Sequence, residues 1–529
     1  MSSTAGFDVD AAYLEIICRA LATSGPTTAE GLSQRLALPR SAIDAALATL
    51  ESQGAIFRGS FIPGQSAGSA EQWCNRYVLE RIHRQTLSQL RAEVEPCDDR
   101  AFAAFRFRWQ HLGSDRLDPG AESVRTILEQ LAGLAYPSEL WEQTILPARI
   151  RDYRPEHLDL LCMSGEFSWV AAPLDDDPER SAEFPSRVSF KSRRAKSYRG
   201  IPDAEIEERD QPVIAALSSH GAQYLDQLAD HAGLSERDTL AGLWRLAASG
   251  LVSNDSFAPL RLLAAETDAV RSGGSNGSRA SAKHAAAVRA RLKSSLSGRW
   301  SLVAVAGQLG KAEMYEATGP DRARETAQIL LARHGILARE MLALEPFEIG
   351  WHDLSFALRR MEFAGLIRRG WFVRALSGEQ YATPEALQML AAIRSSAGVS
   401  KVCFSALDPA NPFGVLLPGC GITREPGNII VAAGGRMILG FAGRALQIPE
   451  PLDERTFVEA LESVMTMRPK VTIENINGIP ALESDYVEAL AAMRFHSDGR
   501  ALVYDGLPGP LPARAARQSQ LSQSVGPAK

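Results

Sequence analysis

Residues 238–257 read DTLAGLWRLAASGLVSNDSF. Apolar side chains recur at helical spacing up to Gly250, where a glycine can end a helix in a left-handed conformation. The bulky run after that glycine predicts a strand. Two stretches upstream, VIAALSSHG (213–221) and LDQLADHAGL (225–234), predict two shorter helices. Three helices followed by the strand of a hairpin are typical of a winged-helix domain.

The same pattern recurs along the chain. It is repeated in residues 14–61 and 326–372, and the glycines that end the first and last helices lie 29 or 30 residues apart in all three copies. A degenerate fourth copy runs from Gly133 to Gly165 and ends LDLLCMSGEFSW. Copies at uneven intervals favour tandem winged-helix domains over a solenoid. A set of unrelated helical hairpins is the alternative interpretation.

The periodicity changes after the last copy. Residues 400–448 alternate and carry turn signals, and Gly434–Gly435 between two apolar runs is a strong hairpin signal. The sequence therefore predicts an α+β fold of tandem winged-helix domains followed by a small antiparallel β-barrel or sheet domain. The predicted segments are winged helices at 11–65, 209–262 and 322–385, a helical segment at 71–112, a degenerate winged helix with a basic strand at 121–200, a flexible basic linker at 267–298, a β-barrel or hairpin domain at 400–450, a C-terminal α/β segment at 451–507 and a disordered tail at 508–529.

Length and composition limit the class of protein. A chain of 529 residues is too long for one hydrophobic core and predicts several domains. Hydrophobic residues make up 45% and charged residues 23% of it, which is ordinary for a globular protein. The net charge of −6 argues against a uniformly basic nucleic-acid binder, so we expect any such role to depend on local patches.

Several classes of site and segment are not expected. No run of 18 apolar residues occurs and the N-terminus lacks the pattern of a secretory signal, so no membrane association is expected. The six cysteines form no CxxC pair and the nine histidines have no ligand spacing. This predicts a cytoplasmic protein with no metal site and no cofactor. A GxxxxGK[ST] phosphate loop is missing, which argues against an ATPase or helicase motor in this sequence.

Basic residues cluster locally with aromatic residues. The stretch RVSFKSRRAKSYR (187–199) holds six basic side chains and no acid, and FRFRWQHL (105–112) places two arginines around an aromatic ring. Arginine and lysine bind phosphates, and aromatic rings stack on exposed bases, so these residue types together indicate nucleic-acid binding. A solvated surface is the alternative for any single charge. The candidate nucleic-acid-binding residues are Arg76, Arg84, Arg91, Arg106, Arg108, Trp109, Lys191, Arg193, Arg194, Lys196, Arg199, Arg368, Arg369 and Trp371.

Several long blocks resemble the C-terminal region of the large helicase-related proteins, Lhr. These blocks are EQWCNRYVLERIHRQTLSQLRAEVEP (71–96), FRFRWQHL (105–112), WEQTILPARIRDYRPEHLDLLCMSGEFSW (141–169), GRWSL (298–302), LIRRGWFV (366–373) and LDPANPFG (407–414). They fall in the family's order from about residue 11 to residue 505, without the family's helicase core. Where family members usually have a PISFFLRED strand and then a tryptophan, this sequence has RVSFKSRRAKSYRGIP, with neither the acid nor the tryptophan.

The resemblance implies more than the residue pattern does. The Lhr C-terminal region is a string of winged helices with a β-barrel, similar to AlkZ-type winged-helix DNA glycosylases, and is linked to uracil excision and to self-association. Base excision requires a carboxylate that stabilises a cationic sugar and orients water. By analogy with the family, this would be an acid near the end of the chain, Asp505 in LVYDG, with Asp408 in LDPANPFG as the second candidate. A turn role is the alternative for both.

The functional hypothesis is a DNA-binding repair protein, with base excision by a DNA glycosylase, of uracil among other bases, implied by the resemblance. The expected partner is single-stranded or damaged duplex DNA, and a homo-oligomer is a further expectation. The alternative is a non-catalytic nucleic-acid-binding or scaffold module that works with a separate Lhr-type helicase core. A transcription regulator is disfavoured, because regulators usually combine one winged helix with a sensor domain.

Overall fold

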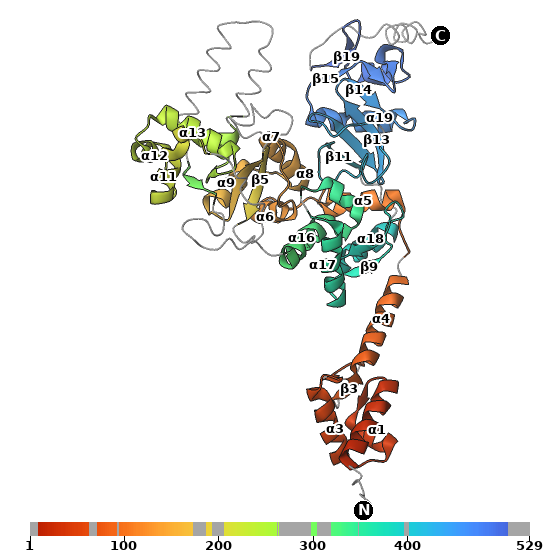
Figure 1. Ribbon diagram of the computed structural model, residues 1–529. Helices are drawn as coiled ribbons and strands as arrows, with labels where there is room; N and C mark the ends of the chain where they lie inside the picture. Colours follow the sequence, from red (N-terminus) through yellow and green to blue (C-terminus); the bar gives the residue numbers. More distant parts are fainter. Residues whose placement is uncertain are drawn as a thin grey trace, which may run out of the picture. The chain divides into compact units, whose positions relative to one another are not determined.

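The helical repeats form winged helices in both compact units of the chain, Met1–Glu95 and Pro96–Lys529 (Figure 1). Each unit is considered by itself. The computed structural model describes residues 9–62, 71–92, 95–172, 187–192, 206–261, 263, 298–303, 319–346, 349–395, 401–419 and 421–505. The predicted tail at 508–529 and all but one residue of the predicted linker at 267–298 lie outside these ranges. Of the described helices, none combines the length and the apolar character that crossing a membrane requires.

The first unit contains one winged helix followed by a long helix. Its elements are α1 (Val9–Thr23), β1 (Thr27–Thr28), α2 (Ala29–Leu36), α3 (Arg40–Ser52), β2 (Ile56–Gly59), β3 (Gln72–Asn75) and α4 (Arg76–Ala92). The three strands form an antiparallel sheet in the order β1-β3-β2. Apolar residues at helical spacing on α1, α2 and α3 form the core, among them Ile17, Leu32 and Leu47.

The second unit begins with two winged helices that share one core. The first contains α5 (Asp99–Trp109), η1 (Gly113–Asp115), α6 (Ala121–Gln130), α7 (Ser138–Leu140), η2 (Trp141–Ile145), α8 (Leu146–Arg149), α9 (Pro155–Met163), β4 (Phe167–Ala172) and β5 (Arg187–Ser192). The next contains η3 (Glu208–Asp210), α11 (Gln211–His220), α12 (Leu225–Ala232), α13 (Glu236–Ala248), β6 (Val252–Asn254) and β7 (Trp300–Leu302). Trp300 joins the two, because its ring packs edge-on against both Trp169 and Trp244.

The wing of this second domain closes later than the sequence predicts. Strand β7 pairs antiparallel with β6, so that Asn254 faces Trp300. The strand pairing of this domain, predicted at 209–262, therefore extends to residue 302, and the segment predicted as a linker between domains falls in the sequence between two paired strands. Periodicity could not reveal this, because a three-residue strand carries too little pattern to be assigned to a partner more than forty residues earlier in the chain.

A further winged helix follows. Its elements are α16 (Gly319–His334), β8 (Ile336–Leu337), η4 (Arg339–Leu344), α17 (Trp351–Phe363), β9 (Arg368–Gly370), β10 (Gln380–Ala382) and α18 (Pro384–Ser395). The strands pair in the order β8-β10-β9, the same arrangement as in the first unit. In this domain α17 is the helix that leads into the wing.

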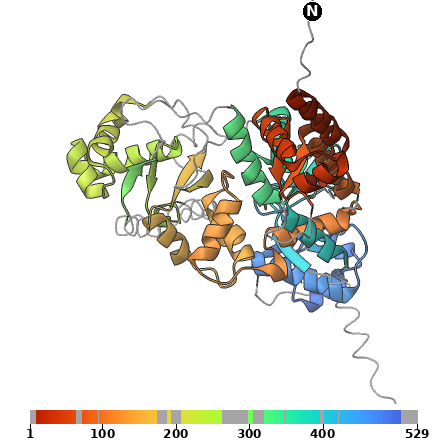
Figure 2. The ribbon, with the colours of Figure 1, turned by 90° about the horizontal axis from the view of Figure 1, so that it is seen from below.

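The C-terminal module is blue in Figures 1 and 2. It consists of β11 (Lys401–Ser405), β12 (Ile429–Ala433), β13 (Arg436–Ala442), β14 (Ala445–Gln447), α19 (Glu454–Met467), β15 (Val471–Ile473), β16 (Asn475–Ile476), β17 (Ile479–Pro480), η5 (Ala481–Glu483), α20 (Val487–Ala492), β18 (His496–Ser497) and β19 (Leu502–Tyr504). One sheet has the order β11-β12-β13-β14-β16-β17 and the other β15-β19-β18. The expected hairpin is present, with Gly434 and Gly435 between β12 and β13.

The described strands form two open sheets and no closed barrel, so of the two predicted forms the sheet is present and the barrel is not confirmed. In the larger sheet β11 and β17 are edges, and α19 packs on β12 and β13 with Phe457, Leu461 and Val464 in the core. Strands β14 and β16 pair in parallel, and α19 lies between them in the chain and provides the crossover that a parallel pair needs. The larger sheet is therefore mixed rather than antiparallel.

Helix α5 lies at the centre of the second unit, next to α16 and α18 (Figure 1). Its Phe107 packs against Phe404 and Phe413 of the C-terminal module, with ring centroids 5.2 and 6.3 Å apart. The tip of the β12–β13 hairpin also contacts α5, since a Cβ on Gly435 would collide with the carbonyl oxygen of Arg100. The C-terminal module is therefore packed directly on α5.

This contact predicts the effect of a methyl group at the hairpin tip. Gly435 has a φ of +74°, so Gly435→Ala combines backbone strain with a collision. We expect the free energy of unfolding to fall by about 2–4 kcal/mol in a denaturant titration followed by circular dichroism. Gly443→Ala is the matched control, because Gly443 also has a positive φ, +59°, and has open space around it. Equal losses in the two variants would contradict the contact between the hairpin and α5.

Candidate functional site

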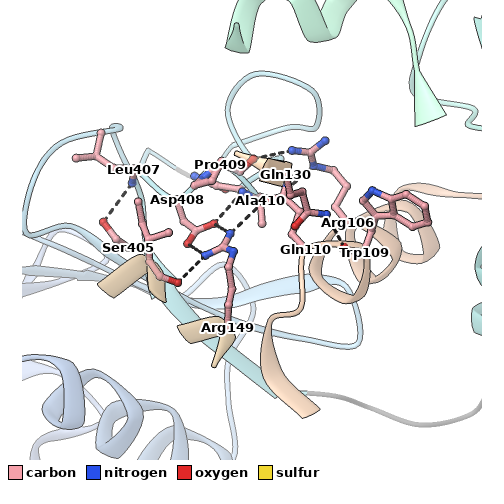
Figure 3. A network of polar contacts seen from close by, with 12 residues as sticks. Arg106, Trp109, Gln110, Gln130, Arg149, Ser405, Leu407, Asp408, Pro409 and Ala410 are labelled. Carbon is pink, nitrogen blue, oxygen red and sulfur yellow. Dashed lines mark hydrogen bonds and ion pairs between the residues drawn. The ribbon is translucent and has the colours of Figure 1, made fainter. Parts of the chain in front are cut away.

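A fully buried ion pair joins α8 to the C-terminal module (Figure 3). Arg149 Nη1 and Nη2 each donate to one carboxylate oxygen of Asp408 at 2.8 Å, and both side chains are 0% exposed. Arg149 Nη2 also donates to Oε1 of Gln110 at 3.1 Å, and Asp408 Oδ1 accepts from the backbone N–H of Ala410 at 2.8 Å. This bidentate geometry is the strongest form of carboxylate recognition by arginine.

Asp408 was expected either to act in catalysis or to form a turn. The structure places it away from solvent, with both oxygens bonded to Arg149 and with the backbone bond to Ala410 that an Asx turn requires. A substrate cannot reach this carboxylate, so Asp408 is corrected from a catalytic candidate to a residue that joins modules. The LDPANPFG stretch thus supplies the carboxylate that accepts the hydrogen bonds from Arg149 where α8 meets the C-terminal module.

Arg106 contributes to the same junction from α5 (Figure 3). It is 2% exposed. Its Nη2 donates to the carbonyl oxygen of Pro409 at 2.7 Å and its Nε to that of Ala410 at 3.3 Å, while Nη1 meets Nδ1 of His334 at 2.9 Å. Burial lowers the pKa of Arg106 to about 10, which still leaves the guanidinium charged near neutrality. Arg106 was predicted to bind nucleic acid; since its guanidinium points into the interior, it cannot contact a phosphate here.

Trp109 was predicted to stack on a base, and it too has an internal role. Its Nε1–H donates to the carbonyl oxygen of Ala332 at 2.9 Å, and its ring stacks on Phe105 with centroids 5.7 Å apart. Gly335 has to be a glycine, because a Cβ there would lie 2.8 Å from both rings. Trp109 therefore packs α5 against α16.

A second buried cluster adjoins Arg106. His334 Nε2 lies 2.6 Å from Oε1 of Glu345, which also pairs with Arg333. Because arginine can only donate, His334 accepts at Nδ1 and donates its Nε2–H to Glu345, which makes the ring neutral. Burial lowers the pKa of His334 to about 4, although Glu345 opposes this shift. Burial alone would raise the pKa of Glu345, but the charge of Arg333 and the hydrogen bond from His334 hold it below its usual value.

Asp505 lies at a different place, directly after β19. It is half-buried and borders an open hollow of about 510 Å³ together with Glu462, Met465, Thr466, Pro469 and Tyr504. Glu462, Met465 and Thr466 come from α19, so two carboxylates from different elements border the same hollow. Sequence reasoning missed Glu462, because it lies on a regular helix with no motif around it.

The predicted cationic residues are spread over separate elements. Arg76 is exposed at the start of α4, Arg84 pairs with Glu80 at 2.6 Å on the same helix, and Arg108 pairs with Asp115 at 3.4 Å. Lys191 on β5 is partly exposed, and burial lowers its pKa. The side chain of Arg91 and all of Arg193, Arg194, Lys196 and Arg199 lie outside the described residues.

Among the described residues, several of the predicted ones lie together on the wing of the last winged helix. Arg368 and Arg369 lie on β9, and Trp371 follows directly with 55% of its surface exposed. Arg369 is partly used internally, since it pairs with Glu362 at 3.2 Å and Glu379 at 2.6 Å. Among the described residues, no group of three or more His, Cys, Asp or Glu side chains could hold a metal ion.

The fold defines a tandem winged-helix protein with a C-terminal α/β module. Residues 97–190 and residues 316–402 each match a family of winged-helix domains described as belonging to the large helicase-related protein. The chain is 30% identical over 539 residues to a Mycolicibacterium smegmatis protein named Lhr helicase/probable uracil glycosylase, and 26% identical over 536 residues to the Escherichia coli Lhr helicase/uracil glycosylase. These alignments cover 96% and 92% of this chain, and 33% of each relative.

The resemblance to the Lhr proteins is therefore confirmed. The chain carries two winged-helix domains of the Lhr type and is similar to Lhr proteins over nearly its whole length. It spans about a third of the length of the two relatives.

The buried ion pair predicts an asymmetric response to substitution. Arg149→Met leaves the Asp408 carboxylate buried without its partner, so we expect a loss of about 3–5 kcal/mol in unfolding free energy. Arg151→Met is the control, because Arg151 pairs with Asp118 at an exposed position and should change stability by less than about 1 kcal/mol. The double variant Arg149→Met/Asp408→Leu should recover part of the loss. Similar values for Arg149→Met and Arg151→Met would contradict a structural role for the buried pair.

The neutral His334 predicts a pH dependence of stability. Its pKa is about 4 in the folded protein and about 6.5 in the unfolded chain. Between pH 4 and pH 6.5 this histidine is therefore protonated in the unfolded chain and neutral in the folded protein. Stability should therefore fall as the pH drops from about 6.5 to 4, by up to about 3 kcal/mol from this residue, and the lowered pKa of Glu345 extends the fall at the acid end. His334→Gln keeps a hydrogen-bonding side chain but does not titrate. Its unfolding free energy should depend less on pH over this interval, whereas identical slopes would contradict the assignment.

Proposed function

We propose that this protein binds DNA and removes a damaged base, uracil first, as a DNA glycosylase. The observation that carries the proposal is the similarity, over more than nine-tenths of the chain, to two proteins whose names include uracil glycosylase. Winged helices support the DNA-binding part, since this fold commonly places a helix against nucleic acid.

The hollow at Asp505 supports the chemical part. Base excision requires a nucleotide turned out of the stack, and an open hollow lined by both polar and apolar side chains gives such a base a place to bind. The Asp505 carboxylate would stabilise positive charge at the sugar C1′ while the bond from C1′ to the base nitrogen breaks and its electron pair leaves with the base. Water then bonds to C1′ and gives its proton to the carboxylate. Glu462 is the second carboxylate at the same hollow.

A second candidate function is a non-catalytic module that binds nucleic acid beside a helicase. The names of the two relatives combine a helicase with a glycosylase, and this chain spans only a third of each. In that case Asp505 would be the turn residue that its place after β19 allows.

Replacing Asp505 tests the first proposal. The wild-type chain should convert a uracil-containing single strand to abasic sites, detected by alkaline cleavage, without ATP or metal. Asp505→Asn should lower the rate by roughly 100-fold or more while DNA binding survives. Asp485→Asn, an exposed carboxylate of the same module, should leave the rate unchanged.

Two outcomes would count against the proposal. Binding without any base removal by the wild-type chain would favour the helicase-associated module. Full activity of Asp505→Asn would separate the glycosylase activity from the hollow at this residue.

A further inference from the structure

Helix α17 exposes an unusual face. Phe356 and Phe363 lie seven residues apart, and Arg359 and Arg360 lie between them at spacings of three and four, so all four side chains share one side of the helix. Phe356 is 59% and Phe363 66% exposed, and both arginines are exposed as well. The opposite side of α17 supplies the core, with Leu354, Leu358 and Met361 buried.

The wing continues this face. Arg359 donates to Glu379 at 3.0 Å, and Glu379, which directly precedes β10, also accepts from Arg369 on β9 at 2.6 Å and from the hydroxyl of Tyr381 at 2.9 Å. These bonds fix the base of the wing to α17. The exposed Trp371 follows β9 directly, so aromatic and cationic side chains extend from the helix onto the wing.

The corresponding helices of the other three winged helices lack this combination. On α3 the exposed arginine is Arg40, which pairs with Asp44 of the same helix at 2.9 Å. Helix α9 exposes Leu160 and Met163 with no arginine, and the second half of α13 is largely buried in the shared core. Among the described helices that lead into a wing, α17 is the one that presents arginines and aromatic rings together.

The chemistry of this face selects its ligand. Reading a duplex groove requires polar side chains that reach the base edges, which phenylalanine cannot replace. Phenyl rings bind bases most strongly by stacking on their flat faces, which are accessible only where the bases are unpaired. The two arginines can bind the phosphates between successive bases. Seven helical residues rise about 10 Å, close to three nucleotide steps of about 3.4 Å. The separation of the two rings therefore fits the bases of a single strand that runs along the helix.

We propose that the α17 face, formed by Phe356, Arg359, Arg360 and Phe363 and continued by Trp371 on the wing, is a stacking surface for single-stranded nucleic acid. The inference rests on the proposed function, and it adds the surface that would hold the unpaired strand. A second copy of the chain is a poor partner for this face. If the apolar side chains of two copies met, the arginines of both copies would be buried next to one another, and their like charges would oppose the contact.

The test measures binding alone. A fluorescent thymidine oligonucleotide, which contains no uracil, is titrated with the full chain and followed by anisotropy, beside a hairpin duplex of the same charge. Phe356→Ala/Phe363→Ala should weaken single-strand binding by about tenfold or more and duplex binding much less. Arg360→Gln should reduce the slope of log K against log salt by about 0.7.

Controls keep loss of fold and loss of catalysis apart from loss of stacking. Leu160→Ala/Met163→Ala removes equally exposed apolar side chains from α9 and should not change binding, and thermal melts should show that all variants are folded. The thymidine strand contains no uracil and its binding does not depend on base removal, so failure of the glycosylase proposal would leave this result intact. Unchanged single-strand affinity in the double phenylalanine variant, or a change only in its sedimentation mass, would overturn the stacking surface.

Discussion

The ion pair between Arg149 and Asp408 constrains how the second unit folds. A charge without water or a partner is too costly to bury, so the end of α8 and the 407–410 turn must meet wherever this unit folds. The same turn directs the carbonyl oxygens of Pro409 and Ala410 at Arg106 on α5. Three parts of the chain that are distant in sequence are thereby held in one arrangement.

This arrangement removes several of the predicted nucleic-acid-binding residues from the surface. Arg106 and Arg149 serve the interior, and Arg369 is shared between two carboxylates. Among the described helices that lead into a wing, α17 combines exposed arginines with exposed aromatic rings. In a protein of net charge −6, binding of a polyanion would have to depend on such local surfaces.

Periodicity and glycine positions were enough to predict the winged helices and the hairpin at Gly434–Gly435, because both depend on local physics. They failed where tertiary packing decides. The alternation of aromatic and basic residues in FRFRW indicated nucleic-acid binding, yet α5 is enclosed and Arg106 finds its acceptors some 300 residues later in the chain. The β6–β7 pairing across a long wing was likewise invisible. The α17 face went unnoticed because Phe356 and Phe363 have the spacing of core residues.

We infer that the modules held together by buried charge present α17 and its wing to nucleic acid. Hydrogen–deuterium exchange of the full chain with and without a thymidine oligonucleotide tests this inference. The strand should slow exchange in peptides from α17 and the β9–β10 wing, while α5 and the 407–413 turn, already protected, should stay unchanged. Protection confined to α3, α9 or α13 with none at α17 would contradict it.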